Sequence, residues 1–235
     1  TGGTSTGSCD NISDVADVAN EENLYLHVDA AWAGSAMICP EFRNLWSGIE
    51  KADSIVFNPH KWLGAQFDCS VQLLRDASMQ KNTLSISPEY LKTKGVTGIT
   101  NLSDYTIQLG RRFRALKLWF LLRAEGLSGL RKVIRDHIKW STDLHDSIRK
   151  LKNVEILTQP ILGLFTFRFV SEKTTKTNEL NEKILQDIND EGTIYLTPTK
   201  VKDNYVIRFT AGTFELKEED VHLAYKCIKE KSEKL

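Results

Sequence analysis

Two short apolar runs, each followed by a charged residue, constrain the fold of this chain most. The run 24–26 precedes Asp29, and the run 54–57 precedes Lys61. Each run has the length and composition of a buried strand, and residues 42–51 between them are typical of a short helix. This order predicts a mostly parallel sheet with right-handed crossovers. In such sheets ligands bind beyond the carboxyl ends of the strands, where both charged residues are expected.

An amine and a carboxylate at two strand ends of one sheet suggest a site for pyridoxal phosphate (PLP), provided that both side chains share one pocket. Lys61 would hold the cofactor as a Schiff base, and Asp29 would keep the pyridine nitrogen protonated so that the ring takes up electrons. A lysine amine with a pKa of ~10.4 is protonated at neutral pH and reacts poorly, whereas burial frees its lone pair. His60 and Trp62 flank Lys61, which favours partial desolvation.

Taken alone, each of the two residues has a simpler interpretation. A lysine after a strand is most often a solvated loop residue, and an aspartate there most often caps a turn or a helix. The flanking sequence favours the site, because Pro59 fixes its own φ and turns the chain just before Lys61. Small residues around the aspartate leave room for a flat ring: Ala30, Ala31, Ala33 and Gly34.

The composition argues against several classes of protein. The 235 residues carry 31 basic and 31 acidic side chains, so there is no basic surplus for nucleic acid. No apolar run approaches the ~20 residues of a membrane span. The four cysteines are widely spaced, and no His/Cys/Asp spacing suggests a metal site. We therefore expect a cytoplasmic protein with reduced thiols that binds neither nucleic acid nor membrane.

The first part of the chain predicts further elements around the two strands. A helix capped by Asn11 or Ser13 should run to about Glu22, and we expect its inner face to carry Ile12, Val15 and Ala19. Residues 68–74 are typical of another strand. Residues 85–101 contain two glycines and few apolar residues, which indicates a mobile loop that carries Tyr90.

The second part predicts an α+β unit. Helices are expected from Ser103 or Asp104 to about Arg123, ended by Gly126, and over 128–151. The remaining elements are strands over 154–157, 163–170, 193–196 and 205–210, and helices over 177–189 and 216–231. We place a domain change near residue 118, which divides the chain into 1–118 and 119–235.

The segment HVDAAWAGSAMICPEFRNLWSGIEKADSIVFNPHKWLGAQFDCS, residues 27–70, resembles the group II PLP-dependent amino acid decarboxylases. Within that group it is most similar to the aromatic L-amino acid decarboxylases. The resemblance continues through SPEYLK and LGRRFRALKLWFLLR and covers essentially the whole chain. It implies an α/β protein of PLP-dependent transferase fold type I, which is aspartate aminotransferase-like. Residues 1–118 would be the second half of the large domain, and residues 119–235 the small C-terminal α+β domain.

The resemblance also implies roles for individual residues. Lys61 would be the Schiff-base lysine and Asp29 the partner of the pyridine nitrogen. The remaining cofactor contacts would be Ala31 against one ring face, Thr4 near the ring, and Asn58 and His60 close to the phosphate.

Two further residues bear on the reaction and its substrate. Tyr90 matches the loop tyrosine that protonates the alpha carbon after carbon dioxide leaves, although the residue alone is typical of a surface aromatic. Related aldehyde synthases carry Phe there, so Tyr90 favours decarboxylation. Gly110 matches a pocket position that is Gly in several enzymes for dopa or indolic substrates. Gly64-Ala65-Gln66 and Gly2 depart from the usual pattern, which leaves the substrate open.

The implied activity is that of a carboxy-lyase, which converts an aromatic L-amino acid of the dopa, tryptophan, 5-hydroxytryptophan, tyrosine or phenylalanine class to the amine and carbon dioxide. One alternative is an aromatic aldehyde synthase or another fold-type I PLP lyase. A different class is a non-catalytic chain that keeps the fold for binding or assembly. Family members are much longer, so we expect a C-terminal fragment that needs its N-terminal half and a homodimer for activity.

Overall fold

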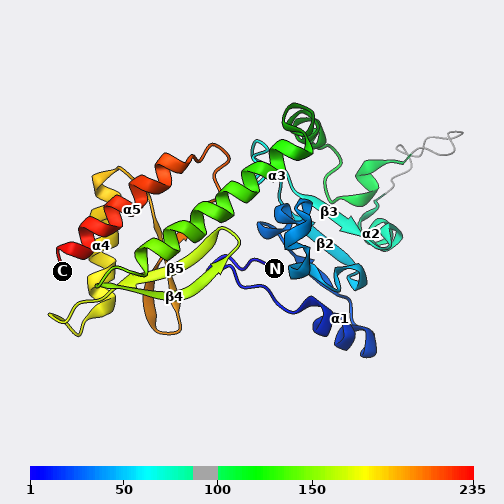
Figure 1. Ribbon diagram of the computed structural model, residues 1–235. Coiled ribbons are helices and arrows are strands. Elements are labelled where there is room, and N and C mark those ends of the chain that lie inside the picture. The colour runs from blue at the N-terminus through cyan, green and yellow to red at the C-terminus, as the bar shows by residue number, and fades with distance from the viewer. Residues whose placement is uncertain (87–99) are drawn as a thin grey trace, which may run out of the picture.

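The computed structural model describes residues 1–86 and 100–235, and Figure 1 shows two groups of elements joined by a long helix. One group holds α1 (Ile12–Glu21), β1 (His27–Asp29), β2 (Ser54–Phe57), β3 (Val71–Leu74) and α2 (Ala77–Leu84). The other holds β4 (Val154–Ile161), β5 (Leu164–Phe169), α4 (Thr177–Glu191), β6 (Thr197–Val201), β7 (Asn204–Thr210) and α5 (Glu218–Glu233). Helix α3 (Arg114–Ile148) runs along both groups.

The first sheet has the strand order β1-β2-β3. Strand β1 is parallel to β2, with Asp29 opposite Val56, and β2 is antiparallel to β3. The predicted strand 54–57 is confirmed. The run 24–26 was wrongly included in a strand, because Leu24 and Tyr25 are exposed and β1 begins only at His27. The third strand likewise begins at Val71 rather than at residue 68.

Short 3-10 helices connect β1 and β2 in place of the predicted helix over 42–51. They span Ala33–Ile38, Pro40–Trp46 and Ile49–Lys51. The last two are separated by Ser47 and Gly48, and the φ of 89° at Gly48 is favourable only for glycine. A Cβ on Gly48 would also meet the Cα of Ser13 at 2.6 Å, so this glycine lets α1 pack closely against the connection.

Helix α1 begins as predicted, and two of the three residues predicted for its inner face, Ile12 and Ala19, are buried. The Asn11 side chain accepts a hydrogen bond from the backbone N–H of Asp14, which caps the helix. Ile12, Ala16 and Ala19 are the buried residues, whereas Val15 is 48% exposed. The expectation that Val15 faces the core was therefore wrong.

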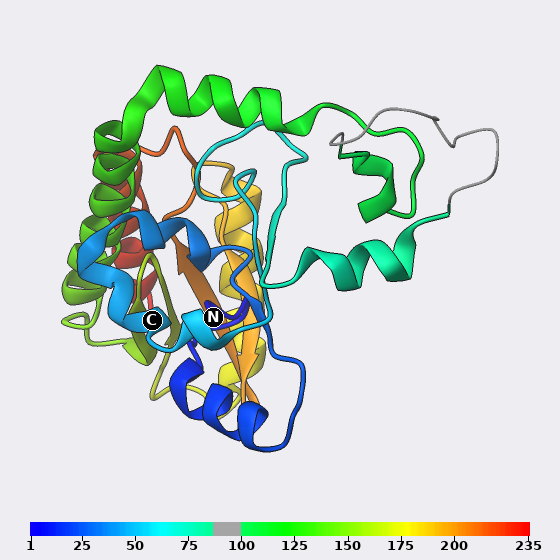
Figure 2. The same ribbon diagram turned by 90° about the vertical axis from the view of Figure 1, so that its right-hand side faces the viewer.

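Helix α3 begins later than predicted. Residues Leu102–Tyr105 form one 3-10 turn, and the α-helix starts only at Arg114. Gly126, at φ 65° and ψ 171°, interrupts it as predicted, and the part after the glycine runs to Ile148. Figure 2 shows the first part of α3 crossing above the rest of the chain. Within residues 1–86 and 100–235, no helix is long and apolar enough to cross a membrane.

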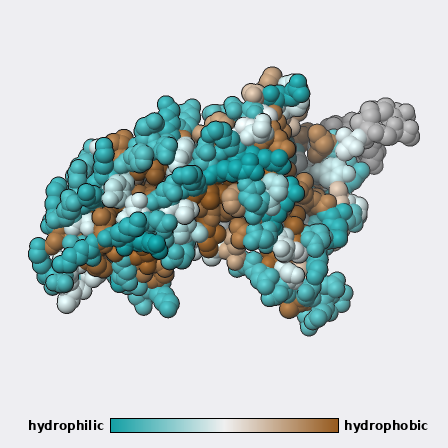
Figure 3. All heavy atoms as spheres, viewed as in Figure 1, coloured by the Kyte–Doolittle hydropathy of each residue, from teal (hydrophilic) through white to brown (hydrophobic). Residues whose placement is uncertain are grey.

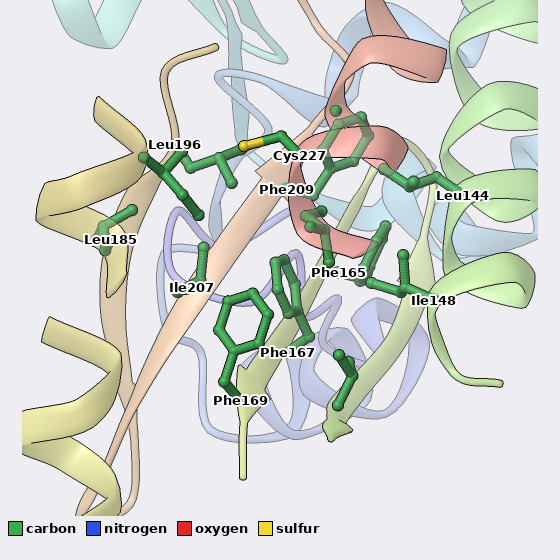
Figure 4. Close-up of a cluster of buried hydrophobic side chains, with 14 of the residues drawn as sticks. Leu144, Ile148, Phe165, Phe167, Phe169, Leu185, Leu196, Ile207, Phe209 and Cys227 are labelled. Carbon is green, nitrogen blue, oxygen red and sulfur yellow. The ribbon is translucent and has the colours of Figure 1, made fainter. Parts of the chain in front are cut away.

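The second sheet has the order β4-β5-β7-β6 with antiparallel neighbours throughout. Phe165, Phe167 and Phe169 alternate along β5 and are fully buried. They meet side chains of β7, α3, α4 and α5 in a cluster that we call the second core (Figure 4). Because successive side chains of a strand point to opposite faces, the three rings lie on one face of β5. The antiparallel sheet thus supplies a flat apolar face that three helices cover.

The predicted strand 193–196 was wrong, because β6 begins at Thr197, directly after that segment. The side chain of Asn189, near the end of α4, instead holds the backbone of Leu196 by two hydrogen bonds of 2.9 and 3.0 Å. Leu196 is buried in the second core, which explains the apolar pattern that suggested a strand.

A separate cluster, the first core, lies around the connection between β1 and β2. It combines alanines with the fully buried indoles of Trp46 and Trp62. Helix α3 contributes Leu130 and Ile134 to the first core and Leu144 and Ile148 to the second. The helix thus packs on both cores, and the division at residue 118 stays a prediction.

Candidate active site

Lys61 lies in a tight turn just after β2. Its backbone N–H donates to the carbonyl of Asn58 at 2.9 Å, and the N–H of Ala65 donates to the carbonyl of Pro59 at 3.0 Å. The Lys61 side chain is exposed, whereas the next residue, Trp62, is fully buried. The turn therefore presents the amine outward and anchors itself in the first core through the following indole.

Asp29 is the last residue of β1. Its carboxylate accepts a hydrogen bond from the N–H of Ala31 at 2.9 Å, and the carbonyl of Ala31 accepts from the N–H of Asn58 at 2.8 Å. Asn58 directly follows β2, so these bonds hold the carboxyl ends of the two parallel strands together. As predicted, the two segments are therefore neighbours, and hydrogen bonds between their backbones join them.

A pair of indoles also joins the two segments. Trp32, three residues after Asp29, stacks on Trp62 with ring centroids 4.8 Å apart and an interplanar angle of 13°. Stacked aromatic rings contribute about 0.5–1.5 kcal/mol beyond their buried area. The stack therefore fixes the segment after Asp29 against the residue that follows Lys61.

Lys61 and Trp32 line a cavity of about 600 Å³. Its other lining residues come from the C-terminal part of the chain: the segment 193–197, β7 and the loop after it, and α5. The volume lies in the range of small-molecule sites. Asp29 is exposed and is not among the lining residues. The structure therefore brings Lys61 into the cavity, and a pocket shared with Asp29 stays a prediction.

Arg208 of β7 lines the same cavity, and sequence reasoning missed it. Its Nη1 donates to Thr197 Oγ1 at 2.9 Å, and its Nε donates to the carbonyl of Ser5 at 3.2 Å. Burial lowers the pKa of Arg208 below its ordinary value, yet a guanidinium remains charged at neutral pH. The cavity thus holds a fixed cation that suits an anionic group. A single arginine within the apolar strand YVIRFT was the available signal.

The two residues predicted near the phosphate lie on the turn with Lys61. Asn58 Oδ1 accepts a hydrogen bond from Ser70 Oγ at 2.6 Å. His60 Nδ1 lies 2.9 Å from the amide nitrogen and 2.7 Å from the carbonyl oxygen of Cys69, so the Cys69 backbone orients the ring. The remaining ring nitrogen, Nε2, is the atom that can serve a ligand.

Thr4 lies in an exposed turn closed by the hydrogen bond from Gly7 N–H to the Gly3 carbonyl at 2.7 Å. Gly2, at φ 78°, packs so closely that a Cβ would meet the Cβ of Ala33 at 2.3 Å. The contact from Arg208 to Ser5 places this turn beside the cavity. The predicted contact of Thr4 with the cofactor stays a prediction.

The structure does not place the last two predicted residues in the cavity. Tyr90 lies outside the described residues. Gly110 is exposed, and a Cβ added there would meet nothing within 4 Å. Its predicted role in a substrate pocket therefore stays a prediction.

A second cavity of about 280 Å³ lies between α3 and α5. It is lined by Trp140, Asp143, Leu144, Ser147, Glu218, Val221, His222 and Tyr225. None of the predicted site residues lines it, and it is less than half as large. We therefore assign the candidate site to the cavity that contains Lys61.

Comparison with known proteins decides the family. The profile of the pyridoxal-dependent decarboxylase conserved domain matches residues 1–170. The chain belongs to the pyridoxal-dependent decarboxylase family. Among relatives, the aromatic-L-amino-acid decarboxylase of Rattus norvegicus is 41% identical over 97% of this chain and 47% of its own length.

Solved structures agree with this result. The structure of Oryza sativa TDC with PLP and tryptamine matches 99% of this chain and 49% of its own, at a TM-score of 0.94 and 34% identity. The 4-hydroxyphenylacetaldehyde synthase of Rhodiola rosea matches at a TM-score of 0.90 and 30% identity, over 100% of this chain and 48% of its own. The predicted fold class is confirmed, and the chain spans about half the length of the relatives that it matches.

Proposed function

We propose that this chain carries the cofactor lysine and part of the substrate cavity of a PLP-dependent decarboxylase for aromatic L-amino acids. The observation that carries the proposal is the position of Lys61 in a cavity with Arg208, on the turn that follows β2. An amine opposite a fixed cation suits a ligand with an aldehyde and a carboxylate or phosphate. The similarity to aromatic-L-amino-acid decarboxylase over nearly the whole chain supports the substrate class.

The residues present fit PLP by their chemistry. Lys61 supplies a primary amine for the cofactor's aldehyde, and Asp29 supplies a carboxylate for the ring nitrogen. We propose Ala31 and Thr4 beside the ring, and Asn58 and His60 near the phosphate. When bound, PLP supplies an acceptor for the electrons that carbon dioxide leaves behind.

The protein's own contribution to the reaction is orientation and proton transfer. Arg208 attracts the carboxylate of an incoming amino acid, while Trp32 gives the cavity an aromatic side against which a flat ring can pack. Holding the substrate in one orientation supplies a large share of the rate gain. Tyr90 is the proposed acid whose hydroxyl protonates the alpha carbon, which completes the amine product.

The first experiment substitutes Lys61 and Asp29 in the full-length enzyme. Lys61→Ala should abolish covalent attachment of PLP and the release of carbon dioxide and amine, because no other group on the turn offers an amine. Asp29→Asn should lower amine formation by about 10²-fold, because it removes a charge aimed at the reacting system. Lys51→Ala is the control, since Lys51 pairs with Asp17 on the surface. Covalent attachment that survives in Lys61→Ala would contradict the proposal.

An aromatic aldehyde synthase is the second candidate, favoured by the similarity to the 4-hydroxyphenylacetaldehyde synthase. Product analysis separates the two, because a decarboxylase forms the amine and an aldehyde synthase forms the aldehyde with ammonia. We expect the amine, and Tyr90→Phe should shift the products towards the aldehyde. If the enzyme is another fold-type I lyase, it should form different products. If the chain is non-catalytic, the full-length protein should form no product.

We further propose that this part of the enzyme functions with an N-terminal half and as a homodimer. Strands β1 and β3 are edges of the first sheet among the described residues, and open edges invite pairing with further strands. Hydrophobic residues also lie at the surface in the middle of the face shown in Figure 3. Co-expression with an N-terminal complement should yield one stable complex, and two independent monomers would contradict the proposal.

A cytoplasmic location is part of the same proposal. The cysteines Cys9, Cys39, Cys69 and Cys227 are free, as is common for proteins of reducing compartments. Fractionation of cells that produce the enzyme tests this point, and recovery from a secreted or membrane fraction would contradict it.

A further inference from the structure

The position of Lys61 depends on the residue that follows it. Trp62 is fully buried in the first core, although the amine beside it is exposed. The turn has two backbone hydrogen bonds of its own, and both lie within residues 58–65. Hydrogen bonds from the N–H of Asn58 to the Ala31 carbonyl at 2.8 Å and from the N–H of His60 to the Cys69 carbonyl at 3.3 Å hold the turn against neighbouring segments. The buried indole adds the contact that anchors the turn, and with it the Lys61 Cα, in the first core.

Trp62 has one directional partner in a distant part of the chain. Its Nε1–H donates to Nδ1 of His137 on α3, 75 residues later, at 3.0 Å. His137 is 1% exposed, and burial lowers its pKa to about 4 against a weak opposing effect of Asp136. The ring is therefore neutral at neutral pH, and Nδ1 has a lone pair to accept the hydrogen bond.

The helix that carries His137 continues into the second core, where Leu144 and Ile148 are buried. That part of the chain supplies the remaining cavity residues, including Arg208 and Thr197. The hydrogen bond thus joins the turn that presents the amine to the helix on which the other lining elements pack. It acts together with the hydrogen bond from Arg208 to the Ser5 carbonyl, which also joins the two parts of the cavity.

We infer that His137 is a positioning residue for Lys61 and acts through the hydrogen bond to Trp62. The inference rests on the proposed function of Lys61 as the amine that reacts with the aldehyde of PLP. Loss of the acceptor removes the directional contact that holds the Trp62 indole in place, so the indole is free to move within the first core. Such movement displaces the Lys61 turn relative to Arg208, and small displacements of a reacting group lower its rate strongly.

The test measures how fast Lys61 reacts with PLP in the full-length enzyme. The amine condenses with the aldehyde with loss of water, and borohydride then reduces the product to a stable secondary amine. Mass spectrometry gives the labelling rate of Lys61 relative to that of exposed lysines in the same sample. His137→Leu, which removes the acceptor, should lower this ratio by about tenfold or more. His137→Asn, which restores an acceptor near Nδ1, should return it to within about threefold of the wild type.

Two tryptophan variants separate the hydrogen bond from a general loss of stability. Trp62→Phe removes the donor and should lower the ratio as His137→Leu does. Trp46→Phe is the matched control, because Trp46 is also buried in the first core and its Nε1 has no partner among the described residues. That control should leave the ratio unchanged, and urea denaturation shows which variants are folded under labelling conditions.

This experiment gives different results if the inference fails and if the proposed function fails. Wild-type labelling of Lys61 no faster than that of exposed lysines would overturn both. Preferential labelling in the wild type that persists in folded His137→Leu or Trp62→Phe would overturn the inference alone. An equal loss in Trp46→Phe would also overturn it, because the effect would then belong to any damage to the first core.

Discussion

The two cores of the molecule differ in how completely they are closed. The second core contains fully buried aromatic and branched side chains. Among the described residues after Leu127, only two large hydrophobic residues are exposed, Tyr195 and Leu223. The first core relies on alanines and two indoles, and all other exposed large hydrophobics lie at or before Leu127. The C-terminal part thus buries most of its large apolar side chains, whereas the N-terminal part leaves many of them exposed.

The difference explains where the candidate site lies. The second core holds β7 and therefore Arg208, while the region with more exposed apolar surface holds Asp29 and Lys61. A cavity between two such parts depends on the links that join them. The stacked indoles and the hydrogen bond from Trp62 to His137 are links of this kind.

The largest effect is expected from a change inside the second core. Phe167→Ala should lower the free energy of unfolding by about 3–5 kcal/mol, because it removes a fully buried aromatic ring and leaves a cavity. Phe67→Ala in the N-terminal part is the control, since Phe67 is 75% exposed and should cost less than about 0.5 kcal/mol. Urea denaturation of both variants measures this, and equal costs would break the comparison between the two regions.

A smaller effect is expected where the two regions touch. Gly163, in the turn between β4 and β5, has no room for a side chain, because a Cβ would meet the carbonyl oxygen of Ala211 at 2.6 Å and the ring of Trp62 at 3.5 Å. Gly163→Ala should cost about 1–3 kcal/mol in thermal or urea unfolding. Gly110→Ala, with open space around it, should leave stability unchanged. If Gly163→Ala left the free energy of unfolding unchanged, the contact between the two regions would be loose.

The buried histidine predicts a pH dependence of stability. Burial depresses the pKa of His137 to about 4, below its ordinary value. Between these two pKa values the unfolded chain binds a proton at this residue and the folded chain does not. Stability should therefore fall as pH drops from about 6.5 towards 4, by at most about 1.4 kcal/mol per pH unit from this group. His137→Asn should reduce that slope, whereas His222→Asn, at an exposed position of α5, should leave it unchanged. Identical slopes in all three proteins would contradict the burial argument.

The smallest effect on stability is expected at the exposed apolar surface. Trp119 on α3 is 54% exposed, so Trp119→Gln should change the free energy of unfolding by less than about 0.5 kcal/mol. The same change should weaken association with an N-terminal complement, which analytical ultracentrifugation measures. A large loss of stability in the chain alone would show that Trp119 already packs against other residues of this chain.

Much of the fold followed from local patterns. The predicted strands 163–170 and 205–210 match β5 and β7 closely, and Gly126 was identified as a break in α3. Errors arose where local pattern and packing disagree. Val15 is apolar but points outward, and Leu196 is buried without belonging to a strand. Local sequence does not contain the contacts that decide such cases.

The site was predictable only in part, for the same reason. Asp29 ends β1 and Lys61 lies in the turn after β2, and these two strands lie side by side, so both segments were found from the pattern alone. Arg208, Trp32 and His137 were missed, because their roles depend on contacts between residues far apart in the sequence. A lone arginine in an apolar strand and an indole beside the aspartate were the signals available.

The most direct test of this account is a crystal structure of the full-length enzyme with PLP. We expect a covalent bond from Lys61 Nζ to the cofactor and the Asp29 carboxylate within hydrogen-bonding distance of the ring nitrogen. A cofactor attached to another lysine, or a ring nitrogen far from Asp29, would contradict the claim that these two residues serve one site.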